Sequence, residues 1–354
     1  MTVHRLADSF VDFRSDNTGA AAPEIVDALA AANSGTAAGY GNDRWTELVQ
    51  RRFSELFEKD VQVFPVATGT AANALALASL SPPWGAVYCS PKAHIETSEA
   101  NATGFFGAGV KLVLVEGDYG KIAAPALKTT LVATGIGQKH KSQPAALNLT
   151  QATDMGAVYR LDEVRALTEL AHAYKMKVHM DGARFANALA RLGCTPAEAT
   201  WKAGVDVLSF GVTKNGGLLC DAIVVFSDGI AEPLAYHVRR AGQVWSKMRY
   251  AAAQLLAYVE DGLWLKNAAR ANALAQRIDS GLKALPGVKR AAPIEANEVF
   301  LELPPKVMDG MERDGIVFFR RAPTLGRFVC RFNGNEAEVD ALLASLRRNL
   351  SAAA

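Results

Sequence analysis

The chain has 354 residues, of which 50% are apolar and 21% are charged, an ordinary composition for a soluble globular enzyme of two or three domains. Its formal net charge of +2 gives no electrostatic reason to expect nucleic acid or an anionic membrane surface as a partner. No apolar run reaches the ~20 residues that span a bilayer, and the first residues contain no apolar signal segment, so we expect a cytoplasmic protein.

The four cysteines give no sign of a disulfide framework or a metal site. Cys89, Cys194, Cys220 and Cys330 are far apart and show no CxxC spacing. Cys89 and Cys220 fall in apolar, strand-like segments, which indicates buried thiols in a reducing compartment. The spacing of zinc ligands is also missing, so no metal is predicted.

The N-terminal two thirds of the chain predicts a sheet whose strands alternate with helices. Two helices come first, over residues 24–32 and 44–59, and the second carries its apolar residues on one face. The strands predicted after them are residues 61–66, 86–89, 111–115, 145–149, 176–180, 205–210 and 222–226. Helices are predicted between these strands at 71–80 and 161–174. This alternation favours a mainly parallel sheet covered by helices on both faces.

Thr68, Gly69 and Thr70 form a turn between the first predicted strand and its helix. Glycine allows the backbone to come close to a ligand, and a helix N-terminus offers free N–H groups to an anion. With two threonine hydroxyls as further donors, the turn is a candidate phosphate site. An ordinary helix N-cap at either threonine explains the same residues equally well. Without a GxGxxG or Walker motif, nucleotide binding is not favoured.

Two histidines stand in predicted loops. His94 follows the strand that ends near Cys89, where an imidazole can stack on a ring or act as an acid or base. His140 lies in the polar stretch Gln138–Lys141. An ordinary structural or solvated position is an open alternative for both, and more so for His140.

Asp181 ends a predicted strand, which is where parallel sheets place their ligands. Arg184 follows about one helical turn later, so it can face the same pocket and grip a carboxylate with two hydrogen bonds. The alternatives are an N-cap role for Asp181 and a surface salt bridge for Arg184.

Lys214 is the most informative residue of the chain. It follows the apolar strand that ends at Phe210, and Ser209, Thr213 and a Gly-rich turn surround it rather than a solvated helix face. A strand-end lysine, a strand-end aspartate and a Gly-Thr turn together suit an enzyme that uses pyridoxal phosphate (PLP). The lysine forms the Schiff base, and the aspartate keeps the pyridine nitrogen protonated.

The pattern of elements changes after about Phe226. Long helical stretches are predicted at 232–260 and 263–285, followed by shorter elements. These are strands at 299–303, 316–319 and 328–332 and a last helix at 336–350. We therefore predict a large domain over residues 10–245 and a small C-terminal α+β domain over residues 246–354.

Six strings of residues, in the same order along the chain, resemble one known family. They are Phe13–Asp16, Gly39–Asp43, Thr68–Asn73, Ala93–Glu99, His179–Arg184 and Ser209–Gly217, with a weaker match at Arg327–Val329. The chain resembles the threonine aldolase and β-eliminating lyase group of fold-type I PLP enzymes, and most closely the low-specificity L-threonine aldolases. The resemblance implies an α/β large domain with a mainly parallel seven-stranded sheet and a smaller C-terminal α+β domain.

The same resemblance implies a role for each matched residue. Lys214 holds PLP covalently, Asp181 pairs with its pyridine nitrogen, and His94 stacks on its ring. The remaining cofactor contacts come from Thr68, Gly69, Thr70 and Arg184, and the substrate carboxylate is held by Ser15, Arg184 and Arg327. His140 falls where the family has a second active-site histidine near the substrate hydroxyl. Tyr40 falls in a segment that reaches the neighbouring subunit's site, which implies a homodimer or homotetramer.

The chain departs from the family pattern at several of these strings. Residues 215–221 replace a more usual run of small residues after the lysine, and Asn17 replaces a threonine. Lys141 stands where an aromatic residue is common, and Ala152 and Thr153 stand where many members have Asn or His. These departures bear on substrate preference more than on cofactor chemistry.

The implied reaction is reversible cleavage of L-threonine, L-allo-threonine and related L-β-hydroxy-α-amino acids to glycine and an aldehyde, with His140 or His94 as the base. Another PLP-dependent β-lyase or a racemase is the main alternative. A non-catalytic PLP-type sensor usually carries a DNA-binding domain, and we expect none before Phe13. An aldolase that uses a metal, or a lysine alone, leaves Asp181 and the Thr68–Thr70 turn without a role.

Overall fold

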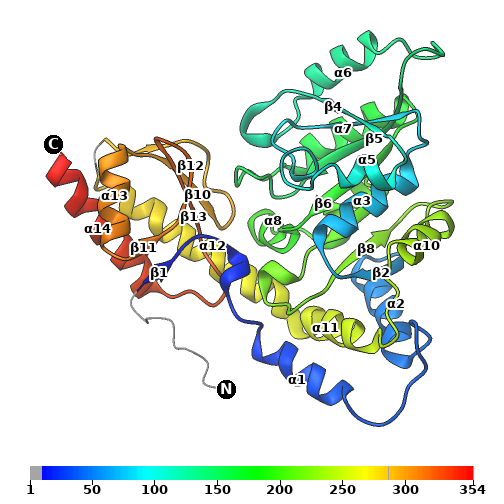
Figure 1. Ribbon diagram of the computed structural model, residues 1–354, viewed down its shortest axis with the longest axis horizontal. Helices are drawn as coiled ribbons and strands as arrows, with labels where there is room; N and C mark the ends of the chain where they lie inside the picture. Colours follow the sequence, from blue (N-terminus) through cyan, green and yellow to red (C-terminus); the bar gives the residue numbers. More distant parts are fainter. Residues whose placement is uncertain (1–9, 286, 354) are drawn as a thin grey trace.

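A computed structural model describes residues 10–285 and 287–353, which form a large and a small lobe side by side (Figure 1). The large lobe contains a seven-stranded sheet in the spatial order β2-β8-β7-β6-β5-β3-β4. Its strands are β2 Gln62–Val66, β3 Gly85–Cys89, β4 Lys111–Leu114, β5 Gln143–Thr150, β6 Lys177–Gly182, β7 Val207–Phe210 and β8 Asp221–Val225. Strands β4, β3, β5, β6 and β7 are mutually parallel, and β8 is antiparallel to both β7 and β2. The predicted fold class is confirmed.

Both faces of this sheet are buried, which explains why its strands are almost continuously apolar. Val207 and Ile223 belong to one core cluster, whereas their chain neighbours Leu208 and Val224 belong to another. Successive side chains of a strand point to opposite faces, so the two clusters lie on opposite sides of the sheet. The covering helices are α1 Pro23–Ala32, α2 Arg44–Leu56, α3 Gly69–Leu80, α4 His94–Thr97, α5 Ala102–Phe106, α6 Ala124–Ala133, α7 Leu161–Ala173, α8 Phe185–Leu192, α9 Pro196–Ala199, α10 Ala231–Arg240 and α11 Arg249–Val259.

The small lobe is an antiparallel sheet covered by helices. Its strand order is β12-β13-β10-β9, and a separate parallel pair joins β1 to β11. The bounds are β1 Val11–Asp12, β9 Lys289–Arg290, β10 Glu298–Glu302, β11 Ile316–Val317, β12 Phe319–Ala322, β13 Leu325–Val329, α13 Pro305–Arg313 and α14 Glu336–Ala353. Its core includes Phe318 stacked on Phe328, with ring centroids 4.4 Å apart.

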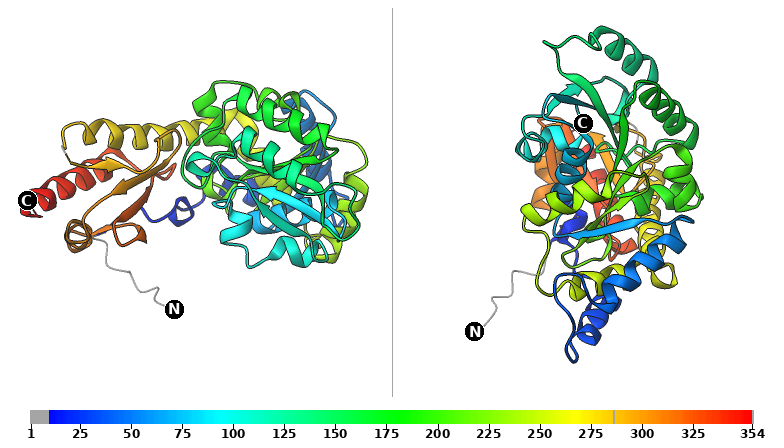
Figure 2. Two further views of the ribbon diagram at one scale, coloured as in Figure 1. Left: turned by 90° about the horizontal axis from the view of Figure 1, so that it is seen from above. Right: turned by 90° about the vertical axis from the view of Figure 1, so that its right-hand side faces the viewer.

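One helix belongs to both lobes. Helix α12, Leu263–Leu282, runs from the large lobe to the small one (Figure 2). Trp264 near its start packs in the core of the large lobe, and Ile278 near its end packs in the core of the small lobe. The two lobes differ in two places from the domains predicted on either side of residue 245. Strand β1, predicted in the large domain, pairs with β11 of the small lobe. Helix α11, predicted in the small domain, packs on α1 and α2 of the large lobe.

The helical stretch predicted over residues 232–260 is interrupted. Helix α10 ends at Arg240 and α11 begins at Arg249, and Gly242 between them has a φ of +71°. That backbone angle lies in the left-handed region, which glycine adopts freely and which cannot continue an α-helix.

The described residues also bear on the cysteines and on membrane-spanning helices. Cys89, Cys220 and Cys330 are buried free thiols, Cys194 is partly buried, and burial raises the pKa of Cys89 to about 12. Of the helices that the structure describes, none combines the length and the apolar character needed to cross a membrane.

Candidate active site

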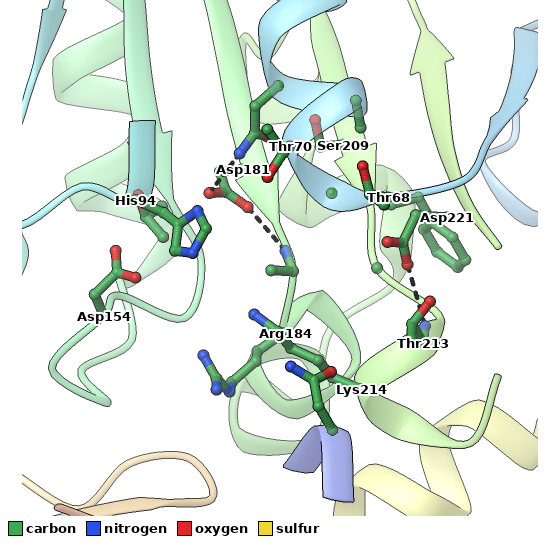
Figure 3. A pocket seen from close by; sticks show the side chains of 18 of the residues that line it. Thr68, Thr70, His94, Asp154, Asp181, Arg184, Ser209, Thr213, Lys214 and Asp221 are labelled. Atoms are coloured by element: carbon green, nitrogen blue, oxygen red, sulfur yellow. Dashed lines mark hydrogen bonds between the residues drawn. The ribbon is translucent and has the colours of Figure 1, made fainter. Parts of the chain in front are cut away.

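Two adjoining cavities open at the carboxyl ends of β5, β6 and β7, between the large sheet and the small lobe. The first has a volume of about 280 Å³, and the second of about 470 Å³. Lining residues common to both are Asn17, His94, Asp154, Arg184 and Lys214. The first cavity also contains Asp181 and the start of α3, whereas the second extends to β10 and β13 of the small lobe. Figure 3 shows how these side chains converge.

Lys214 is held in a short 3-10 turn, Thr213–Asn215, directly after β7. The backbone before it is fixed by Asp221, whose Oδ1 accepts from the N–H groups of Val212 at 2.8 Å and Thr213 at 3.1 Å. The backbone after it is fixed by Asn215, whose amide donates to the Tyr258 hydroxyl and the Trp264 carbonyl, each at 2.8 Å. This fixed turn places the lysine where it lines both cavities.

Asp181 ends β6 and is 2% exposed. Its Oδ1 accepts from the Ala183 N–H at 3.0 Å, and its Oδ2 accepts from the Asn73 amide at 3.1 Å. The same amide donates to Glu99 at 2.8 Å, and Glu99 is in turn hydrogen-bonded to His94 Nδ1 at 2.8 Å. A chain of hydrogen bonds therefore connects Asp181 to His94 through two residues that the sequence did not single out.

Two members of this chain of hydrogen bonds have shifted pKa values. The hydrogen bond to Glu99 raises the pKa of His94 above its ordinary value. Burial raises the pKa of Glu99, against the hydrogen bonds from His94 and Asn73. Since its Nδ1 is bonded to Glu99, His94 has only Nε2 free for a ligand, and its raised pKa favours the protonated ring.

The Thr68–Thr70 turn combines both roles that its sequence allowed. Thr68 is the N-cap of α3, with its Oγ1 accepting from the Ala71 N–H at 3.1 Å. Gly69 and Thr70 form the first residues of the helix and line the first cavity. A Cβ added to Gly69 has only one atom within 4 Å, Asp221 Oδ2 at 3.8 Å, so the backbone faces open space. In the first helical turn, the N–H groups of Gly69 and Thr70 make no hydrogen bond among the described residues and are available to an anion there.

The polar groups that line the first cavity fit PLP. A helix N-terminus with hydroxyls suits the phosphate, a buried carboxylate suits a protonated pyridine nitrogen, and a lysine amine suits the aldehyde. These groups stand on α3, at the end of β6 and after β7, respectively, around one cavity.

The two arginines predicted to hold a carboxylate are already paired with carboxylates. Arg184 donates to both oxygens of Asp16, at 2.8 and 3.1 Å, and its Nη1 lies 3.2 Å from Glu298. Arg327 donates to the same Glu298 at 2.9 Å. All four side chains are at least nine-tenths buried. A guanidinium has five N–H donors, so each arginine keeps donors beyond these pairs.

The network lowers the pKa of Asp16 although its carboxylate is buried. Burial by itself raises the pKa of Asp16, but the charges of Arg184 and Lys214 outweigh it, and the pKa of Asp16 is lowered. The network joins Asp16 near the N-terminus, Arg184 of the large lobe and Glu298 of the small lobe, residues that are far apart in the sequence.

Three further predicted site residues lie outside the first cavity, and two of them line neither cavity. Ser15 lines the second cavity, with its Oγ accepting from the Asn17 N–H at 3.1 Å. His140 is exposed in the turn before β5, and since the cavities open at the other end of that strand, it lies at the opposite edge of the sheet. Tyr40 is 56% exposed and has Arg239 over its ring at 5.2 Å. Neither His140 nor Tyr40 lines the two cavities.

Several lining residues were not identified from the sequence. Asp154 follows the end of β5, where its position after a strand was a usable signal. Arg321 lines the second cavity and Glu298 holds both arginines, but no local pattern marks these two. Asp16, which holds Arg184, ends the matched string Phe13–Asp16, although the resemblance implied no role for it.

Comparison with known proteins places this site in a family. The model of the β-eliminating lyase family matches residues 12–304. The chain belongs to the β-eliminating lyase family. It is 42% identical to the low specificity L-threonine aldolase of Pseudomonas sp. (strain NCIMB 10558), over 98% of this chain and 100% of that protein. It is 40% identical to the low specificity L-threonine aldolase of Pseudomonas aeruginosa, over 97% and 99% of the two chains.

Solved structures confirm the fold of this β-eliminating lyase. Leishmania major threonine aldolase superposes with a TM-score of 0.88 at 24% identity, covering 95% of this chain and 98% of that one. A PLP-bound putative aminotransferase from Clostridium difficile superposes with a TM-score of 0.72 at 11% identity, covering 97% and 93%. The resemblance read from the six strings is therefore confirmed, as is the fold-type I architecture.

A buried histidine beneath the site makes the fold acid-sensitive. His179 is fully buried and hydrogen-bonded to Asn148 at 2.7 Å and Ser209 at 2.9 Å, and burial lowers its pKa to about 4. The unfolded chain takes up a proton near pH ~6.5, so the stability that neutral His179 provides is lost as the pH falls from there toward 4. We expect the free energy of unfolding to drop by about 2–3 kcal/mol from this residue between pH 7.5 and 4.5.

Urea unfolding of His179→Asn at the two pH values tests this expectation, because asparagine cannot take up the proton. The variant should lose less stability on acidification than the parent. Equal losses in the two proteins would contradict the assignment.

Proposed function

We propose that this member of the β-eliminating lyase family is a PLP-dependent, low-specificity L-threonine aldolase. It cleaves L-threonine, L-allo-threonine and related L-β-hydroxy-α-amino acids reversibly to glycine and an aldehyde. The observation that carries the proposal is the convergence of Lys214, Asp181 and the start of α3 on one cavity, in a chain 40–42% identical to two enzymes of that name along nearly its whole length.

Each residue around the first cavity has a defined task in this proposal. Lys214 binds the cofactor covalently and gives way to the substrate amine, and Asp181 holds the proton of the pyridine nitrogen. Thr68, Gly69 and Thr70 bind the phosphate, and His94 packs on the ring. When bound, PLP supplies an electron sink for the bond that breaks at the α-carbon.

The second cavity takes the rest of the substrate. Ser15 and the unengaged N–H groups of Arg184 and Arg327 bind its carboxylate, which fixes the Cα–Cβ bond in the orientation needed for cleavage. Asp16 and Glu298 keep both guanidinium groups in place, so the carboxylate meets donors that are already oriented.

One predicted residue requires a second copy of the chain in this proposal. Tyr40 is exposed and lines neither cavity of its own subunit, so it acts at the site of a neighbouring subunit. His140 lies at the opposite edge of the sheet, away from the cavities. We therefore propose a homodimer or homotetramer with sites at the subunit interface, working in the cytoplasm on a small amino-acid substrate.

Product analysis tests the proposal. The purified protein should be yellow with PLP and should convert L-threonine to glycine and acetaldehyde. A PLP-dependent β-lyase instead gives pyruvate and ammonia from a suitable substrate, and a racemase gives D-allo-threonine from L-threonine, because it inverts only the α-carbon. A protein that stays colourless when PLP is supplied, or that forms no glycine from either threonine diastereomer, overturns the proposal.

A further inference from the structure

We propose that Asp154 is a catalytic residue of this site, whose carboxylate exchanges a proton with the β-hydroxyl of the substrate. The inference rests on the proposed aldolase function and deepens it, because it assigns a base from within the same chain. Within one subunit, His94 is hydrogen-bonded to Glu99 through Nδ1, and His140 is distant from both cavities. Neither histidine is therefore placed to take the proton of the β-hydroxyl.

A tight turn after β5 is built to present Asp154. Thr153 is fully buried, and its Oγ1 donates to the Tyr119 carbonyl at 2.7 Å and accepts from the Ala157 N–H at 3.1 Å. The turn closes with the Gly156 N–H donating to the Thr153 carbonyl at 2.8 Å. Asp154 is therefore attached to a fixed backbone, and its side chain lies beside His94 at the cavity (Figure 3).

Asp154 stands where the two cavities meet, and it lines both of them. The cofactor-binding residues Asp181 and Thr70 line the first cavity, and the arginines for the substrate carboxylate line the second. A substrate whose amine reaches the cofactor in the first cavity, and whose carboxylate is held by the arginines in the second, would have its β-carbon where the two cavities meet. A base for the β-hydroxyl is needed at that place.

The carboxylate of Asp154 is left without a partner. Among the described residues, neither of its oxygens makes a hydrogen bond or an ion pair, and Oδ2 is buried. The other aspartates that face Lys214 or line the first cavity each accept two or more hydrogen bonds; they are Asp16, Asp181 and Asp221. A buried carboxylate without a hydrogen-bond partner destabilises the folded state, so its presence here indicates that it contacts a ligand.

Burial and the charged groups around Asp154 shift its pKa toward neutral pH. Groups from six segments face it, namely His94, Asp181, Arg184, Lys214, Glu298 and Arg321. Burial, with the charges of Asp181 and Glu298, raises the pKa of Asp154 to about 6, against the opposing effect of Lys214 and His94. A carboxyl group of this kind releases and takes up a proton close to neutral pH, as a general base must.

The proposed step conserves atoms and electrons. The O–H bond of the β-hydroxyl breaks and its proton forms a new O–H bond on Asp154. The β-carbon and its oxygen become the carbonyl of the aldehyde, and the electron pair of the Cα–Cβ bond stays with the α-carbon. A proton then reaches the α-carbon to give glycine, so no oxidant or reductant is needed.

Asp154→Asn tests the inference in the PLP-loaded enzyme. We expect kcat for L-threonine to fall about 10²–10³-fold, in the range for loss of a general base. Glycine has no β-hydroxyl, so its binding and the exchange of its α-proton for deuterium should stay within about threefold of the parent. The parent's kcat should fall below about pH 6, and this acid limb should be absent from the residual activity of the variant.

Two further variants make the result interpretable. Asp118→Asn is the matched control, because Asp118 is an exposed aspartate in the neighbouring loop and lines neither cavity of the site; it should behave like the parent. Asp154→Glu keeps a carboxyl group and should recover part of the lost kcat.

The inference is overturned if Asp154→Asn keeps kcat within threefold with an unchanged pH profile. It is also overturned if glycine binding and α-proton exchange fall as far as threonine cleavage, because that pattern marks a structural residue. Failure of the parent itself to cleave any β-hydroxy amino acid would instead remove the proposed function on which the inference rests.

Discussion

Replacing Lys214 by alanine is expected to abolish threonine cleavage, with kcat lower by roughly 10³-fold or more. Lys214 is the sole lysine among the described residues that line the first cavity. Without its amine no covalent attachment of PLP to the chain is possible. The variant should therefore lose the visible absorbance of lysine-bound PLP and fail to yield a lysine adduct after borohydride reduction.

Lys202→Ala serves as the control for this prediction. Lys202 is a surface residue paired with Glu58, remote from both cavities, and its loss should leave absorbance and activity unchanged. An active Lys214→Ala enzyme that still forms a borohydride-stable adduct would place the chemistry on another lysine, and the assignment of the site would fail.

Replacing Arg184 by methionine is expected to cost about 3–5 kcal/mol of unfolding free energy, because it leaves two buried carboxylates without their shared cation. Asp16 loses both of its hydrogen bonds from the guanidinium, and Glu298 keeps only Arg327. The same change removes a donor for the substrate carboxylate, so KM for L-threonine should rise. Urea unfolding and steady-state kinetics on one preparation measure both effects.

Arg160→Met is the matched control for the stability loss. Arg160 pairs with Asp162 on the surface, where both side chains are more than 60% exposed, and such pairs contribute about 0–1 kcal/mol. If Arg184→Met unfolds at the same urea concentration as this control, the buried network does not stabilise the junction between the lobes.

The parts of the site that the sequence predicted are those with a local signature. Lys214 and Asp181 follow apolar strands of a parallel sheet, and the carboxyl ends of such strands meet at one edge, so their proximity could be inferred without a structure. The Thr68–Thr70 turn likewise sits between a strand and a helix. The strands of the large sheet followed from their apolar runs, whereas α5, α6 and α8 were not predicted and the stretch 232–260 contains two helices.

The rest of the site depends on contacts that no local pattern encodes. Asp16 is 168 residues from Arg184, and nothing near either residue marks the pair. Arg184 therefore looked like a free anchor for a ligand, whereas it is also the centre of a buried ion network. His140 matched a family position, but only the direction of β5 shows that it lies across the sheet from the cavities. Asp154 follows β5 in a loop, and its sequence neighbours give no sign that its side chain faces the cavities.

The continuous helix α12 limits how the two lobes can move relative to each other. It is anchored by Trp264 in one core and by Ile278 in the other, and it contains neither proline nor glycine between Leu263 and Ser280. Sharp kinks in helices arise at such residues or at bulges, so α12 offers no hinge along this span. A rigid-body closure of the lobes around a ligand would have to bend this rod or break its packing. We therefore expect substrates to enter and leave through motions of side chains and loops at the cavity mouth, with the two lobes held at a constant distance.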